Sequence, residues 1–381
     1  MINFHPSRTK ALEQLNFFVE KHLSFYARDR NFDFGPDKRT NTSCLSPYVT
    51  HGVLSEKEII KKVIKKFSFS KIEKFIQEVL WRTYWKGWLE RRPSLWTEFI
   101  NDLEILKKEF QNNKIFKNAI NGNTDIDCFN DWVSELKKTG YLHNHTRMWF
   151  SSVWIFTLDL PWQLGAEFFM KYLKDGDPAS NTLSWRWTAG LQTKGKNYVA
   201  QEWNIKKFTN QRYEKVKLNE NAVPIVSDKE YIQINPEFNN GEIIDDQTLL
   251  IFDNQLCFEE SDFKNLKFKK IMLIQNTNLT RSIELDENLI KFKSDLICDQ
   301  QARLQNNFEV EVKDISYLRN LDLSNVIALY PGVGENLDFL NENKISLKFL
   351  YREFDQMTNQ YCNKGFFNFK KFIPKIISQF E

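Results

Sequence analysis

The stretch that decides the fold is residues 139–187, which read TGYLHNHTRMWFSSVWIFTLDLPWQLGAEFFMKYLKDGDPASNTLSWRW. Asn144, Arg147 and Ser151 follow one another at helical spacing, so one stripe of a predicted helix carries an amide, a cation and a hydroxyl among aromatic residues. Polar groups on an inward stripe need buried partners. This stretch therefore predicts a helical domain built around a polar site.

Turn signals divide the same stretch into successive helices. Asp159-Leu160-Pro161 indicates the end of the first helix and the start of the second, because proline is tolerated in the first helical turn. Asp175-Gly176-Asp177-Pro178 ends the second helix and begins a third. Its two carboxylates are thereby placed at a helix N-terminus, where the helix dipole stabilises negative charge.

Charge is unevenly distributed along the 381 residues, a length that holds two to three domains. Residues 1–214 carry 33 Lys and Arg against 24 Asp and Glu, whereas residues 215–381 carry 20 against 26. The basic first part fits a polyanionic partner such as nucleic acid, and it fits an ordinary solvated surface equally well.

Cysteines and apolar runs exclude several classes of protein. The five cysteines form no C-x-x-C pair, which disfavours a metal site and a disulfide framework. The sequence shows neither a signal peptide nor an apolar run long enough to span a membrane, so a cytoplasmic protein that binds no membrane is predicted. All 11 tryptophans lie between Trp81 and Trp203, which suits a large flat ligand or a Trp-rich helical core.

The composition changes after residue 214. Residues 215–247 are rich in Asn, Glu and Pro and are interpreted as a linker between domains at 1–214 and 248–381. Short apolar runs follow at 249–252, 270–274, 295–298, 326–330 and 347–351. Buried strands that alternate with helical patterns predict a small parallel α/β domain. The lone G-x-G at 332–334 is weak evidence of nucleotide binding.

Several motifs, taken together, resemble one known family. They are HN-x-x-RM (143–148), PW (161–162), DGD-x-A-S-N (175–181), W-x-W (185–187), TS-x-LSPY (42–48) with Gly52, and E-x-x-WR (78–82). Their order and spacing resemble the flavin-binding core of the photolyase and cryptochrome family. The resemblance covers roughly residues 20–213, about half of the chain. It implies an all-helical FAD-binding domain followed here by the α/β domain, as in a short photolyase-like protein.

The resemblance implies that FAD is bound non-covalently. The implied FAD-binding residues are Tyr26, Thr42, Ser43, Leu45, Ser46, Arg82, Asn144, Arg147, Asp175, Asp177 and Asn181. Thr42, Ser43 and Ser46 lie in the diphosphate segment, although hydroxyls before a helix also serve as plain N-caps. Arg147 and Asp175 are expected to pair beside the flavin ring, with Asn181 facing its N5. An amide suits a fully reduced flavin, which a carboxylate would repel.

The family's reaction implies a substrate and an enzyme class. Excited reduced FAD gives an electron to a pyrimidine dimer flipped out of UV-damaged DNA, and the cyclobutane ring splits, so the chain is expected to be a deoxyribodipyrimidine photolyase, a carbon-carbon lyase. The implied catalytic residues are Glu78, Trp81, Asn144, Met148 and Trp187. The implied DNA-binding residues are Arg30, Lys194 and Lys196. A monomer is expected.

Alternatives to dimer repair stay open. Enzymes for the (6-4) photoproduct usually carry a histidine where Asn144 stands, and His143 and His145 point elsewhere on the helix. A cryptochrome-like blue-light photoreceptor would share every flavin residue. A helical binding module would keep the lysines and tryptophans without FAD. The tryptophans of α-helical spacing around Trp81 are also compatible with an ordinary core.

The resemblance further implies an electron path and an antenna domain. Trp185 and Trp162 match two electron-transfer tryptophans of the family, and Phe110 lies near the position of the third. Trp154 and Tyr172 are candidates for another exit to the surface. The family's α/β antenna domain normally precedes the flavin domain, so the segment 248–381 is interpreted as a relocated version. A second chromophore is not identified.

Overall fold

The computed structural model describes residues 3–380, which divide into two compact units. The first, here called the helical unit, comprises the residues up to Phe4, Phe25–Cys44 and Ser94–Ile232. The second, here called the sheet unit, comprises His5–Ser24, Leu45–Pro93 and the chain from Gln233 onward.

The helical unit is built on a dense aromatic core. Its fully buried rings include Trp96, Phe99, Trp132, Trp149 and Trp154, and burial of such large rings dominates the hydrophobic stabilisation of a helical core. Its helices are α2 (Tyr26–Asp29), α6 (Ser94–Phe110), α7 (Lys114–Asn121), α8 (Asp127–Thr139), α9 (Asn144–Ser152), a π-helical turn (Val153–Thr157), α10 (Trp162–Tyr172), α11 (Pro178–Ala189) and α12 (Glu202–Phe208).

The helix ends follow the turn signals in the sequence. The π-helical turn extends α9 to Thr157, and Asp159 then adopts a positive φ of 51° before Pro161 caps α10. Asp177 caps α11, because its Oδ1 accepts a hydrogen bond of 2.7 Å from the Ser180 backbone N–H. Gly190 ends α11 with a φ of 84°, a conformation that favours glycine.

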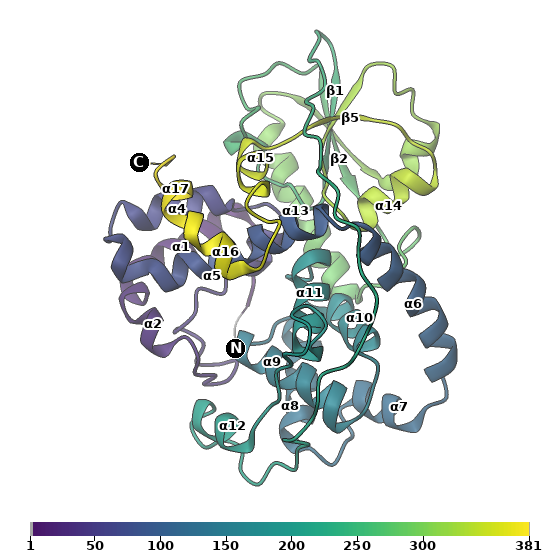
Figure 1. Ribbon diagram of the computed structural model, residues 1–381. Coiled ribbons are helices and arrows are strands. Elements are labelled where there is room, and N and C mark those ends of the chain that lie inside the picture. Colours follow the sequence, from purple (N-terminus) through teal and green to yellow (C-terminus); the bar gives the residue numbers. More distant parts are fainter. Residues whose placement is uncertain (1–2, 381) are drawn as a thin grey trace. The chain divides into compact units, whose positions relative to one another are not determined.

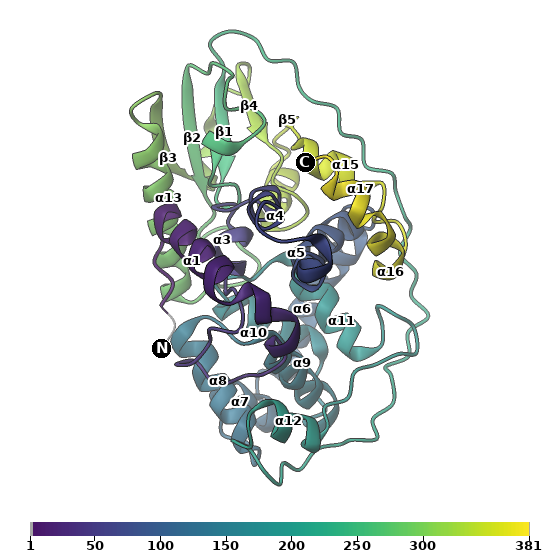
Figure 2. The ribbon, with the colours of Figure 1, turned by 90° about the vertical axis from the view of Figure 1, so that its left-hand side faces the viewer.

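The sheet unit contains a five-stranded parallel sheet in the order β3-β2-β1-β4-β5, as Figure 2 shows. The strands are β1 (Thr248–Phe252), β2 (Lys270–Gln275), β3 (Glu309–Asp314), β4 (Val326–Leu329) and β5 (Lys348–Leu350). Leu250 and Phe252 join a core on one face that includes Phe339 of α14 (Glu335–Glu342). The predicted combination of a helical domain with a parallel α/β domain is confirmed.

One predicted strand position is a helix. Residues 295–298 lie in α13 (Glu287–Leu304), where Leu296 and Ile297 are buried, and the third strand is β3, at 309–314. The edge strand β3 pairs only with β2, and its residues are partly exposed. A short apolar run is compatible with a buried strand or with one face of a helix, and length decides between them.

Helices from both ends of the sequence complete the sheet unit. They are α1 (Arg8–Lys21), α3 (Ser46–Thr50), α4 (Glu56–Ile64), α5 (Phe69–Glu90), α15 (Glu353–Asn359), α16 (Phe366–Phe369) and α17 (Ile373–Ile377). The long helix α5 packs against α15 and α16, which Figure 1 shows in yellow. The segment that carries Cys362 can approach α5 closely because Gly87 has no side chain at the place where the sulfur of Cys362 lies. The domain boundaries at 214 and 247 stay a prediction, since α5 lies in the same compact unit as the sheet.

No helix within residues 3–380 combines the length and the apolar composition needed to cross a membrane.

Candidate functional site

An ion pair in the helical unit forms the centre of the candidate flavin site. The Nη2 of Arg147 on α9 donates to the Oδ2 of Asp175 at 2.8 Å, and its Nε donates to the carbonyl of Leu142 at 2.9 Å. The Asp175 side chain is 3% exposed and that of Arg147 is 22% exposed. The expected pairing is therefore present, and the guanidinium keeps an accessible edge.

Aromatic and charged side chains next to Arg147 restrict its orientation. Two guanidinium groups lie over the ring of Tyr141, that of Arg147 at 5.0 Å and that of Arg39 at 5.3 Å from its centre. Arg39 in turn pairs with Asp33 at 3.0 Å and with Glu135 at 2.8 Å. Because these cations contact a ring face and buried carboxylates, Arg147 is held in one orientation.

Asp33 anchors this network to α9. Its carboxylate accepts hydrogen bonds from the Thr146 hydroxyl at 2.6 Å and from the Gly35 backbone N–H at 2.9 Å. Burial disfavours the ionised form of Asp33, but Arg39, His143 and these hydrogen bonds hold its pKa well below the usual range. Sequence patterns did not indicate this fully buried carboxylate, because its partner Thr146 lies 113 residues away.

One accessible face of α9 carries the residues assigned to the substrate and the flavin. Asn144 is exposed, and Arg147 and Met148 are partly buried, whereas Thr146 and Trp149 are buried on the opposite face. Asn144, Arg147 and Met148 stand at helical spacing, so all three face the same side. The structure thus brings together three predicted residues, and their roles stay predictions.

The histidines on either side of Asn144 are both engaged in the structure. His143 is 1% exposed and caps α9, with its Nδ1 accepting from the His145 backbone N–H at 3.1 Å. Burial lowers the pKa of His143 to about 3, and the Asp33 carboxylate only partly opposes this. The His145 ring lies on Trp149 with 4.4 Å between ring centres. His143 is therefore neutral near pH 7 and cannot donate a proton as an imidazolium.

The N-terminal half of α11 carries the other flavin candidates. The Nδ2 of Asn181 donates to the carbonyl of Ala166 at 2.8 Å, so α10 fixes the orientation of the amide. Asp177 uses one carboxylate oxygen to cap the helix. Trp187 is partly buried and stacks on Tyr198 with ring centres 5.6 Å apart. Lys194 and Lys196 are exposed in the turn that follows α11.

The predicted diphosphate segment crosses from one compact unit to the other. Tyr26, Arg30, Thr42 and Ser43 belong to the helical unit, and Leu45 and Ser46 belong to the sheet unit. Helix α3 begins at Ser46 as expected, and Cys44 before it has a positive φ of 51°. Leu45 is buried, whereas the three hydroxyl side chains of the segment are partly exposed. Their assignment to FAD stays a prediction.

The predicted substrate helix α5 lies in the sheet unit, and an aromatic residue covers its tryptophan. The ring of Trp81 stacks on Phe366 of α16 with ring centres 3.4 Å apart and an interplanar angle of 11°. Tyr84 fixes the same segment, because its hydroxyl donates to the carbonyl of Lys364 at 2.9 Å. Arg82 pairs with Glu56 at 3.1 Å. The sequence analysis predicted neither the stacking of Phe366 on Trp81 nor the ion pair of Arg82 with Glu56. The roles assigned to Glu78, Trp81 and Arg82 stay predictions.

The aromatic neighbours of Trp185 bear on the electron path. Rings within 6.5 Å of Trp185 are those of Phe150, Trp154 and Phe169, at 6.3, 6.2 and 5.1 Å. Trp162 instead stacks on Phe99 at 5.6 Å. Trp154, one of the two candidates for another exit, is thus the tryptophan in contact with Trp185.

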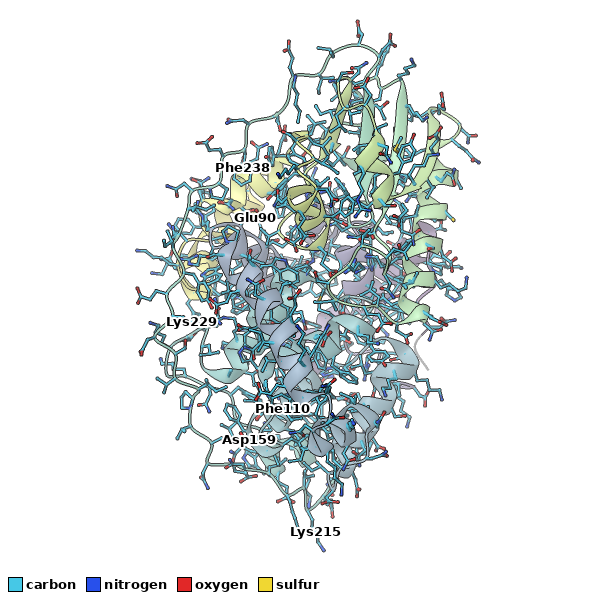
Figure 3. The ribbon with its side chains drawn as sticks, turned by 90° about the vertical axis from the view of Figure 1, so that its right-hand side faces the viewer. Glu90, Phe110, Asp159, Lys215, Lys229 and Phe238 are labelled. Atoms are coloured by element: carbon cyan, nitrogen blue, oxygen red, sulfur yellow. The ribbon has the colours of Figure 1, made fainter. Side chains whose placement is uncertain are left out.

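Trp154 also connects toward the surface. Phe168 lies 6.1 Å from Trp154, and Tyr172 lies 5.1 Å from Phe168 and is partly exposed. On another side Phe116 lies 6.0 Å from Trp154 and 6.5 Å from Phe110, which Figure 3 labels.

Among residues 3–380, no group of His, Cys, Asp or Glu has the arrangement of a metal site.

Comparison with known proteins bears on the central and C-terminal parts of this site. Residues 75–228 match the family described as the FAD binding domain of DNA photolyase. The predicted resemblance and the predicted FAD-binding domain are thereby confirmed.

Two proteins to which this chain is similar are deoxyribodipyrimidine photo-lyases. The protein of Agrobacterium fabrum is 30% identical over 188 residues, which cover 49% of this chain and 38% of the relative. That of Buchnera aphidicola subsp. Baizongia pistaciae is 30% identical over 191 residues, which cover 49% of this chain and 39% of the relative. The matches therefore span less than half of the length of these relatives.

A solved structure, a class III photolyase from Agrobacterium tumefaciens, aligns with 54% of this chain and 43% of its own, at 28% identity and a TM-score of 0.46.

Proposed function

We propose that the chain binds FAD non-covalently and uses it, under blue light, to split cyclobutane pyrimidine dimers in UV-damaged DNA. The observation that carries this proposal is the Arg147–Asp175 ion pair on the accessible side of α9, within a segment that matches a photolyase FAD-binding domain. The reaction would make the chain a carbon-carbon lyase.

The donor set of the helical unit fits a flavin ring. A carboxylate, a guanidinium and an amide, from Asp175, Arg147 and Asn181, supply the acceptor and donors that its polar edge requires. Asn144 lies one turn before Arg147 on the same face of α9. Tyr26, Thr42, Ser43, Leu45, Ser46, Arg82 and Asp177 would complete the FAD-binding set. Bound FAD supplies the light absorption and the electron for dimer splitting.

Residues of the chain would bind and orient the lesion. A flipped dimer needs stacking partners and an apolar wall, for which Trp81, Trp187 and Met148 are suited, while the carboxylate of Glu78 would accept a hydrogen bond from a base edge. Arg30, Lys194 and Lys196 would contact phosphates. The neutral, buried state of His143 argues against (6-4) photoproduct repair, which uses a protonated histidine near the lesion.

A cryptochrome-like photoreceptor is the second candidate, and one observation favours it. Phe366 covers one face of Trp81, the residue assigned to lesion stacking. A photoreceptor needs the flavin residues but not an open face on Trp81. A cytoplasmic monomer, and a relocated antenna domain at 248–381, stay predictions.

Two measurements test the proposal in order. An absorption band of oxidised flavin in the purified full-length protein, released by denaturation, would show non-covalent FAD. Repair of an oligonucleotide with one cyclobutane dimer is then followed under blue light, with a dark control and a (6-4) oligonucleotide in parallel. If the protein contains flavin but repairs neither lesion, the photoreceptor is the remaining candidate. A protein without bound flavin would contradict both the repair enzyme and the photoreceptor.

A further inference from the structure

A hollow lies within the sheet unit, beside the helix α5. One side of α5 forms its floor through Thr83, Lys86 and Glu90, and Tyr330 and Tyr351 form a wall. It holds about 450 Å³ of space, part of it open to solvent. Figure 3 shows Glu90 and Phe238, both of which line it.

The hollow occupies a place where parallel sheets commonly bind ligands. Tyr330 follows the last residue of β4, and Tyr351 follows the last residue of β5, so both stand at the carboxyl edge of the sheet. Ligands of open parallel sheets bind outside the carboxyl ends of the strands. The rings of Tyr330 and Tyr351 are 4.8 Å apart, and Phe238 lies 5.4 Å from Tyr351, which gives the hollow an apolar side.

Most charged groups around the hollow are already matched. Arg352 donates two hydrogen bonds to Asp355, at 2.8 and 2.7 Å, and lies 3.5 Å from Glu56. Arg82 also pairs with Glu56 at 3.1 Å. These two carboxylates therefore have guanidinium partners of their own.

Glu90 is likewise engaged. Its Oε2 accepts from the Tyr330 hydroxyl at 2.7 Å, and its Oε1 accepts from the Val333 backbone N–H at 2.8 Å. Burial raises the pKa of Glu90, although both hydrogen bonds oppose the shift. Both carboxylate oxygens of Glu90 therefore already have hydrogen-bond donors.

Lys86 differs from its charged neighbours. Among residues 3–380, no side chain forms an ion pair or a hydrogen bond with its ammonium group, and Asp355 and Glu56 act on it only through space. Burial lowers its pKa. The Oγ1 of Thr83 and the Oδ1 of Asn359, which also line the hollow, are buried and have no hydrogen-bond partner within the described chain. Buried polar groups of native proteins are nearly always satisfied.

We propose that this hollow is a binding site for a small molecule that carries an oxyanion, a carboxylate or a phosphate group. The Lys86 ammonium and the Thr83 hydroxyl donate to the oxyanion, the amide of Asn359 bonds a polar group beside it, and the aromatic wall contacts the body of the ligand. The inference does not depend on FAD or on DNA repair.

Calorimetric titration of the full-length protein with sodium phosphate and, separately, with sodium benzoate tests the site. We expect saturable binding of at least one anion, and benzoate over phosphate if the aromatic wall contributes. Lys86→Met should weaken binding roughly tenfold or more, because hydrogen bonds to charged groups are the strong ones. The matched control is Lys71→Met, which removes an exposed lysine of the same helix and should bind as the parent does.

Thr83→Val is a second variant, nearly isosteric, which keeps the inference testable if Lys86→Met folds poorly. It should weaken binding several-fold without changing the circular dichroism spectrum. Absence of saturable binding with both anions would mean that water alone satisfies these groups, and it would overturn the proposal. Equal affinity of the parent, Lys86→Met and Thr83→Val would overturn it as well.

Discussion

Replacement of Phe366 by alanine tests how strongly the C-terminal segment is held on α5. Phe366 is 6% exposed, and its ring stacks on Trp81 with centres 3.4 Å apart. Truncation of a buried phenylalanine costs about 3–5 kcal/mol, a figure that includes the preference of paired rings. Because α16 is short and near the chain end, it can partly relax, and we expect about 3 kcal/mol.

The assay is urea unfolding followed by near-ultraviolet circular dichroism, which reports the packing of aromatic rings. With a slope of about 2 kcal/mol per molar urea, the loss corresponds to a midpoint lower by about 1.5 M. The adjacent Phe367 is 81% exposed, so Phe367→Ala is a matched control that should shift stability by no more than about 0.5 kcal/mol. Tryptophan fluorescence should move to longer wavelength only in Phe366→Ala, as Trp81 becomes wetter.

Equal midpoints for Phe366→Ala and Phe367→Ala would refute the reasoning, because they would show that the stack on Trp81 contributes nothing to stability. The same pair of variants bears on the choice between repair enzyme and photoreceptor. Binding of dimer-containing DNA that is tighter in Phe366→Ala than in Phe367→Ala would show that Phe366 competes with a lesion for Trp81.

Further predictions concern the helical unit. Asp33→Asn breaks a buried ion pair and should lower stability by about 3–5 kcal/mol at pH 7 in urea unfolding. Because the pKa of Asp33 is lowered in the folded protein, its contribution to stability is present above the ordinary pKa of about 3.9 and is lost as the pH falls through the folded pKa. The stability of Asp33→Asn should lack this dependence on acid pH. Parallel loss of stability in the parent and the variant on acidification would contradict the prediction. Asp175→Ala should weaken FAD binding about tenfold or more, seen as a lower ratio of flavin to protein absorbance, and an unchanged ratio would remove Asp175 from the site. Trp185→Phe and Trp154→Phe should slow photoreduction of oxidised flavin but leave repair near normal after reduction with dithionite, whereas Trp162→Phe should have the smaller effect; the reverse order would restore the path through Trp162.

Local signals were sufficient where the chain forms regular elements from its own neighbours. The cap at Asp177, the break at Asp159 and the start of α3 at Ser46 all follow from residues within one helical turn. The strands β1, β2 and β4 follow from short apolar runs bounded by polar residues, and β5 follows from the run LKFLY, which Lys348 interrupts. Strand β3 was not predicted, because the edge strand EVEVKD alternates charged residues with valines and contains no apolar run.

Contacts between distant segments could not be predicted in this way. The ion pair of Arg39 with Glu135, and the stack of Phe366 on Trp81, join residues whose own sequence surroundings give no indication of the partner. Tryptophans at helical spacing on α5 were compatible with a substrate face and with a core, and spacing alone does not distinguish the two. The pairing of Arg147 with Asp175 was expected only through the resemblance to a known family, because it too joins distant positions.

The sheet unit is assembled from segments at opposite ends of the chain, and this sets the order of events during synthesis. Asn359 contacts the carbonyl of Gly87 at 3.5 Å across a separation of 272 residues. At about 5–20 residues per second, a ribosome needs roughly 14–55 seconds to make the intervening chain. Throughout that interval the aromatic side of α5, with Trp81 and Tyr84, has no α15 or α16 to cover it. Nascent chains that expose such surface bind chaperones or aggregate. The yield of this protein in a cell should therefore depend more strongly on chaperone supply than the stability of the folded protein alone would suggest.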